Sequence, residues 1–140
     1  MILKVGIGRL VDKLLTNMAS TVEGKSAVKM YLYSGHDTTL LPLLHVLDVF
    51  DGKWPPFAAN ITLELYENEK KEAFVQTLYE GEPQLVPGCS DTMCPMNEFK
   101  TAIGKFVMTE GDYQSQCSVE DDDFIRYARS RQSKSTPLST

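Results

Sequence analysis

Two neighbouring residues, His36 and Asp37, carry the side chains in this sequence that are best suited to chemistry. They lie in the run Tyr33-Ser34-Gly35-His36-Asp37-Thr38-Thr39. A protonated imidazole holds phosphoryl oxygens, and a protonated carboxyl gives its proton to a leaving alcohol, which is the usual division of labour in phosphate monoester cleavage. An acidic medium keeps both groups protonated. The alternative is structural: Asp37 or Thr38 only caps a helix, and the pair only satisfies backbone groups.

The segments on either side predict a strand-to-helix junction at this pair. Val28 to Tyr33 is a short apolar run before Ser34-Gly35, which is typical of a buried strand followed by a tight turn. Helical spacing then follows in Leu40, Leu43, Leu44 and Leu47. This helix is expected to begin at about Asp37 to Leu41, because Pro42 is tolerated only in a first turn. A helix N-terminus beyond the end of a strand attracts anions.

The rest of the chain predicts a scaffold of helices and a hairpin. Helical spacing in Leu10, Val11, Leu14, Leu15 and Met18 predicts a first amphipathic helix. Ile61 to Tyr66 and Phe74 to Tyr79 predict an antiparallel hairpin. Pro83 to Pro95 is expected to be a loop. A last helix is predicted from Met96, Phe99, Ile103 and Phe106. The two glycines of Gly6-Ile7-Gly8 are not interpreted as a phosphate loop, because the third glycine of that motif is missing.

Composition limits the functions that this chain can serve. Its 140 residues, 42% of them hydrophobic, are enough for one modest domain. The formal net charge of −5 argues against a nucleic-acid partner, because phosphate backbones demand a basic face. No run approaches the roughly 18 apolar residues that a transmembrane helix needs. Cys89 and Cys94 flank a short turn where a local disulfide is reasonable in an oxidising compartment, although three free thiols, with Cys117, remain the alternative.

The run Tyr33 to Leu40 resembles the second signature of the histidine acid phosphatases, a branch of the histidine phosphatase superfamily. Further segments are similar to this family in order and spacing: Asp48-Val49-Phe50-Asp51-Gly52, Pro55-Pro56-Phe57-Ala58, Leu63-Glu64-Leu65-Tyr66, and Val86-Pro87-Gly88-Cys89-Ser90 with Cys94-Pro95. Together they cover about Leu14 to Cys117. Met30 to Leu44 and Lys53 to Phe57 resemble the lysophosphatidic acid phosphatases within the family.

The resemblance implies an α/β fold. Residues 1–117 are expected to be the C-terminal part of a three-layer α/β/α histidine-phosphatase-like domain, incomplete and with a β-hairpin. Residues 118–140, rich in charge, serine and threonine, are expected to form a polar, disordered tail. The family pattern also implies a disulfide between Cys89 and Cys94, and an upstream partner for Cys117.

The same resemblance implies hydrolysis of phosphate monoesters, with lysophosphatidic acid as the substrate, through a phosphohistidine and without a metal or cofactor. His36 matches the histidine that contacts phosphate, and Asp37 matches the proton donor. The family's nucleophilic histidine belongs to an Arg-His-Gly-x-Arg-x-Pro motif, which this sequence lacks. The other histidine, His45, lies in the leucine-rich stretch and is expected to serve the core or the helix surface.

The missing motif leaves two alternatives to an enzyme. One is a catalytically inactive truncated isoform that acts as a binding or regulatory module. The other is a small secreted interaction domain, with Asn60-Ile61-Thr62 as a glycosylation acceptor. The resemblance suggests a mitochondrial location, with a lysosomal or secreted one as the alternative.

Overall fold

The computed structural model describes residues 2–117, so the predicted tail at 118–140 lies outside the described residues. The chain divides into two compact units, one ending at Thr109 and one beginning at Glu110. The first unit contains α1 (Ile2–Val22), α2 (Asp37–Leu47), β1 (Ile61–Glu67), β2 (Ala73–Tyr79), β3 (Glu82–Gln84), β4 (Met93–Pro95) and α3 (Met96–Gly104). The second contains α4 (Glu110–Cys117), none of whose residues is buried. None of the helices at residues 2–117 is long and apolar enough to span a membrane.

The sheet is antiparallel and centred on β2. β1 pairs with β2 along its whole length, from Ile61 opposite Tyr79 to Glu67 opposite Ala73. β3 and β4 both pair with β2, at its later and earlier residues respectively. The predicted α/β class and hairpin are therefore confirmed. The prediction that Pro83 to Pro95 is only a loop is wrong, because its two ends form β3 and β4.

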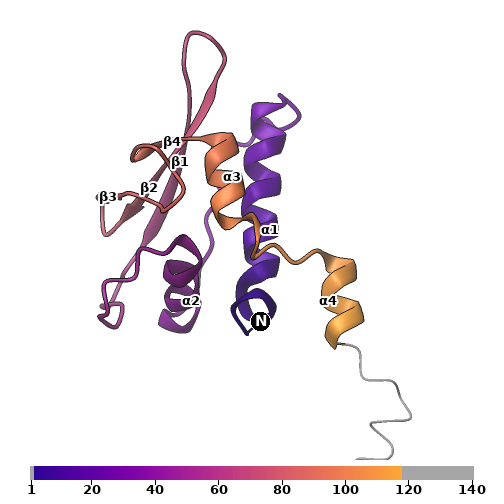
Figure 1. The fold of residues 1–140 in the computed structure, drawn as a ribbon, viewed down its shortest axis with the longest axis vertical. Coiled ribbons are helices and arrows are strands. Elements are labelled where there is room, and N and C mark those ends of the chain that lie inside the picture. Colours follow the sequence, from indigo (N-terminus) through magenta and orange to yellow (C-terminus); the bar gives the residue numbers. More distant parts are fainter. Residues whose placement is uncertain (1, 118–140) are drawn as a thin grey trace, which may run out of the picture. The chain divides into compact units, whose positions relative to one another are not determined.

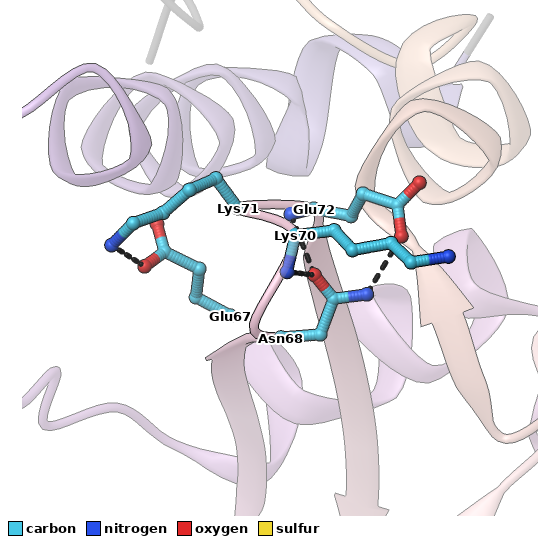
Figure 2. Close-up of polar contacts among 5 residues, drawn as sticks. All are labelled: Glu67, Asn68, Lys70, Lys71 and Glu72. Atoms are coloured by element: carbon cyan, nitrogen blue, oxygen red, sulfur yellow. Dashed lines mark hydrogen bonds and ion pairs between the residues drawn. The ribbon is translucent and has the colours of Figure 1, made fainter.

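A hydrogen-bonded turn closes the hairpin between β1 and β2 (Figure 2). The Asn68 side-chain oxygen accepts hydrogen bonds from the backbone N–H groups of Lys70 and Glu72, at 3.0 and 2.9 Å. Lys71 Nζ lies 2.7 Å from Glu67 Oε1, and this hydrogen bond to a carboxylate raises the pKa of Lys71. Asparagine side chains commonly support such turns. The turn therefore fixes the register of the two long strands.

The core forms where α3 lies between the sheet and α1 (Figure 1). α3 contacts β2, β4, α1 and α2, and its Phe99 and Ile103 are buried. α1 buries Val11, Leu15 and Met18, which belong to its predicted apolar face, and α2 buries four apolar residues. The fully buried apolar side chains come from every layer: Val11, Leu44, Leu47, Val75, Phe99, Ile103 and Met108. The disulfide between Cys89 and Cys94, with an S–S distance of 2.04 Å, ties the loop after Val86 to β4.

The prediction of a strand at Val28 to Tyr33 is wrong. Within the described residues this segment pairs with no strand, and its apolar side chains stay exposed, Met30 by 74% and Leu32 by 85%. A strand needs a neighbouring backbone to bond with, and β1 to β4 pair only with one another. The sequence has strand propensity here, but residues 2–117 supply no partner for it.

Pro42 is the sixth residue of α2, beyond the first turn in which it was expected. Its missing N–H leaves the carbonyl of Thr38 without its usual helical donor. Thr38 is exposed, so water can satisfy that carbonyl. The helix therefore accommodates the half-buried proline because the residue that loses a donor is exposed.

Gly8 and Gly6, both in α1, provide a matched pair for testing the packing of this helix. A Cβ on Gly8 would lie 2.5 Å from the Phe106 carbonyl oxygen and 2.8 Å from Met108 Cβ, whereas one on Gly6 would meet nothing within 4 Å. Gly8→Ala should lower the free energy of unfolding by about 1 to 3 kcal/mol. Gly6→Ala should raise it by about 1 kcal/mol through helix propensity. Urea titrations test both, and equal effects of the two changes would contradict this packing.

Thr77, on the central strand, has a buried hydroxyl that finds no hydrogen-bond partner among the described residues. An unsatisfied buried hydroxyl lowers stability, so Thr77→Val should raise the free energy of unfolding by about 1 kcal/mol. Thr62→Val is the matched control, because Thr62 lies exposed on the neighbouring strand. Thermal and urea unfolding measure both variants. A destabilised Thr77→Val protein would mean that the hydroxyl has a partner.

Candidate functional site

His36 and Asp37 lie together at the beginning of α2. His36 is the N-cap, in an extended conformation, and its carbonyl accepts hydrogen bonds from the N–H groups of Thr39 and Leu40 at 2.8 and 3.0 Å. Its own N–H donates to Thr39 Oγ1 at 3.4 Å. The helix therefore begins with the histidine as cap and the aspartate as its first residue, so neither Asp37 nor Thr38 is the N-cap. An extended, unpaired segment precedes the helix in place of the expected strand.

The Asp37 carboxylate is held by two donors. Its Oδ1 accepts a hydrogen bond from the Thr38 N–H at 2.7 Å. Its Oδ2 accepts one from the indole Nε1–H of Trp54 at 2.9 Å. The carboxylate is thereby oriented on both oxygens while the residue itself stays exposed. An oriented, accessible carboxyl is the arrangement that proton transfer to a bound ligand requires.

The contact with Trp54 was not foreseen from the sequence, where Trp54-Pro55-Pro56-Phe57 is a stiff aromatic connector. Trp54 lies 17 residues beyond Asp37, and no periodicity links the two. The sequence feature that comes closest to predicting this contact is Pro55, which directly follows the tryptophan and is buried in the structure. Proline restricts the backbone of the residue before it, and the hydrogen bond to Asp37 orients the indole.

A hydrogen bond to α1 anchors the segment that leads into the site. The side-chain amide of Asn17, a largely buried residue, donates to the Tyr33 hydroxyl at 2.6 Å. Two residues earlier, the Tyr31 hydroxyl lies 3.1 Å from the hydroxyl of half-buried Ser26. Gly35 then passes close to Thr39, where a Cβ would lie 3.2 Å from Thr39 Cβ. The tether at Tyr33 and this close approach set the path of the chain into the first turn of α2.

The site is open to solvent. Ser34, His36 and Asp37 are all exposed. Two hollows on the described residues, of about 210 and 670 Å³, are lined by other side chains, and neither includes His36 or Asp37. Within residues 2–117 the single arginine is Arg9, on α1. The described residues therefore supply an imidazole and a carboxyl, and no enclosing wall around them.

The remaining residues that the sequence singled out are His45 and the three cysteines. His45 is exposed on α2, with its ring 4.6 Å from that of Phe50. Cys89 and Cys94 form the disulfide, while Cys117 is a free, exposed thiol at the end of α4. Among the described residues, no group of three or more histidine, cysteine, aspartate or glutamate side chains is arranged to hold a metal ion.

Residues 3–80 match the family model described as the histidine phosphatase superfamily, branch 2. The chain belongs to this family. The matched range includes α1 except Ile2, the His36-Asp37 pair, Trp54 and the hairpin. The resemblance noted in the sequence is thus confirmed at the level of the family.

Three relatives place the chain within branch 2. It is 40% identical over 121 residues to "Lysophosphatidic acid phosphatase type 6" of Pongo abelii, covering 83% of this chain and 28% of that protein. It is 39% identical over 121 residues to the Homo sapiens protein of the same name, with coverage of 83% and 28%. It is 36% identical over 116 residues to "Prostatic acid phosphatase" of Homo sapiens, with coverage of 79% and 29%. The chain therefore spans less than a third of the length of these relatives.

The tether between Tyr33 and Asn17 predicts a stability difference between two tyrosines. Tyr33→Phe leaves the largely buried Asn17 amide without its acceptor and should lower the free energy of unfolding by about 1 kcal/mol. Tyr31→Phe, which removes only an exposed contact with Ser26, should change it by less than about 0.5 kcal/mol. Urea titrations compare the two, and equal losses would mean that the Asn17 contact does not anchor the segment.

Proposed function

We propose that His36 and Asp37 are the phosphate-holding and proton-donating groups of an acid phosphatase that cleaves phosphate monoesters, with lysophosphatidic acid as the substrate. The observation that carries this proposal is the exposed imidazole next to a doubly oriented carboxyl, at the start of α2, in a chain of the histidine phosphatase family. The names of the relatives support phosphatase chemistry and favour this substrate.

The reaction assigns one role to each group. A histidine nitrogen attacks phosphorus, and the bond between phosphorus and the alcohol oxygen breaks. The protonated Asp37 carboxyl gives its proton to that oxygen, so that the alcohol leaves neutral. Protonated His36, together with the positive end of the α2 dipole, stabilises the phosphoryl oxygens. Water then attacks phosphorus and gives a proton to Asp37, the bond between phosphorus and the histidine nitrogen breaks, and inorganic phosphate is released.

The attacking histidine is proposed to lie outside these 140 residues. His45 is the other histidine of the sequence, and it lies next to the Phe50 ring. The absence of the Arg-His-Gly-x-Arg-x-Pro motif and the open surface around His36 support this proposal. By itself the chain is then expected to bind phosphate and not to turn over.

The Cys89–Cys94 disulfide bears on the compartment. Disulfides persist in oxidising environments and are rare in reducing ones. We therefore propose that the chain resides in an oxidising compartment.

A chimaera tests the proposed roles. Residues 3–117 replace the matching segment of human lysophosphatidic acid phosphatase type 6, and phosphate release is measured from lysophosphatidic acid and from p-nitrophenyl phosphate. Asp37→Asn should slow release from lysophosphatidic acid by about 100-fold or more, because an alkoxide needs a proton to leave. The loss should be much smaller for p-nitrophenyl phosphate, whose phenolate leaves unprotonated. Asp48→Asn, at the other end of α2, is the matched control.

The outcomes separate the possible functions. Equal losses on both substrates would contradict the role of Asp37 as proton donor. Turnover by the isolated 140-residue chain, abolished by His45→Gln, would contradict an external nucleophile. A chimaera that folds and binds phosphate but releases none would favour the inactive binding module.

A further inference from the structure

Trp54 is attached to the Asp37 carboxylate and yet offers most of its ring to solvent. Its Nε1–H donates to Asp37 Oδ2 at 2.9 Å, and the residue is 61% exposed. A tryptophan normally buries a large apolar area. An exposed indole fixed by one hydrogen bond to a proposed proton donor therefore needs an explanation.

The connector holds this indole in a defined place. The Asp51 carboxylate accepts a hydrogen bond from the Lys53 N–H at 3.0 Å, closing a turn across Gly52, whose φ is +83°. Pro55 is buried directly after the tryptophan. A side-chain turn before Trp54 and a buried proline after it restrict the backbone on both sides. The exposed ring is thus presented by a fixed loop.

The proton-donor role of Asp37 decides what the ring meets. A proton donor must come within about 3 Å of the leaving oxygen in the bound substrate. The alcohol carried by that oxygen then lies beside the side chains that contact the carboxyl. In the described residues Trp54 is the side chain that donates to this carboxylate. The phosphoryl group, held by His36, lies on the other side of the breaking bond.

We propose that Trp54 has two roles that rest on the proposed function: its N–H positions the Asp37 carboxyl, and its exposed ring forms the subsite for the alcohol part of the substrate. The chemical class that this subsite takes is an alkyl phosphate, because an indole face contacts methylene groups well and offers no further hydrogen bond. Trp54 is accordingly a positioning and specificity residue. The monoesters favoured are those whose leaving alcohol carries an apolar chain.

The positioning role is tested in the chain by NMR. Trp54 is the only tryptophan of the sequence, so a ¹⁵N-labelled sample shows one indole N–H signal. Asp37→Ala removes the acceptor and should shift this proton upfield. Asp48→Asn, which removes one charge at the C-terminal end of α2, should leave it nearly unchanged. An indole signal that responds equally to both variants, or to neither, would overturn the positioning role.

The subsite role is tested by titrating the chain with inorganic phosphate, hexyl phosphate and hexanol. Inorganic phosphate should shift the His36 ring signals and have little effect on the indole. Hexyl phosphate should shift both and bind about tenfold more tightly than inorganic phosphate, through the apolar area that it covers. Trp54→Phe should keep most of this advantage, because the ring remains, and Trp54→Ala should lose it.

Each outcome bears on a different claim. If inorganic phosphate shifts His36 and hexyl phosphate gains nothing from Trp54, the subsite is overturned and the proposed function stands. If hexanol alone shifts the indole as much as hexyl phosphate does, the ring is only an apolar surface and the subsite is again overturned. If neither phosphate shifts His36, the proposed phosphate site fails, and the subsite that rests on it fails with it.

Discussion

The packing of α3 between the sheet and α1 is the constraint on which the rest of the structure depends. This short helix contacts β2, β4, α1 and α2, and its Phe99 is fully buried. The same core fixes α2, because Leu43, Leu44 and Leu47 are buried in it. Most helical stability in proteins comes from such packing of an apolar face. The position of the first turn of α2, and with it the placement of His36 and Asp37, follows from burial at the other end of the helix.

The candidate site combines a rigid base with an open surface. Asp37 is held by the Thr38 N–H and by the Trp54 indole, and the incoming chain is tied to α1 through Tyr33. No wall closes over the pair in the described residues, and the apolar side chains of Met30 and Leu32 lie exposed a few residues upstream. Electrostatic catalysis is strongest where water is excluded. The pair is thus open to solvent in a chain that covers less than a third of the length of its relatives.

The sequence predicted the elements whose own pattern is sufficient to specify them. The spacing of Leu40, Leu43, Leu44 and Leu47 predicted α2, and alternation predicted the hairpin, because these periodicities show which face is buried. The prediction of a strand at Val28 to Tyr33 was wrong, because strand formation depends on a partner strand that no local pattern reveals. β3 and β4 were missed because three residues are too few to show a period.

The site was predictable only in part, for a similar reason. The adjacency of His36 and Asp37, and their place at a helix start, are local properties of the sequence. The hydrogen bond from Trp54 arises from the fold, which brings together residues 17 positions apart without any shared periodicity. A tryptophan before two prolines predicts a stiff connector, and it gives no information about which carboxylate the indole meets.

The most direct test of the central claim is a crystal structure of the chain grown with tungstate, a phosphate analogue whose position an anomalous difference map reveals. The account predicts an anion within hydrogen-bond distance of the His36 ring, at the first turn of α2, with the Asp37 carboxyl and the Trp54 ring on the side facing solvent. The peak should disappear in His36→Ala and persist in His45→Ala. Tungstate bound elsewhere, for instance at the lysines of the hairpin turn, with none at His36, would contradict it.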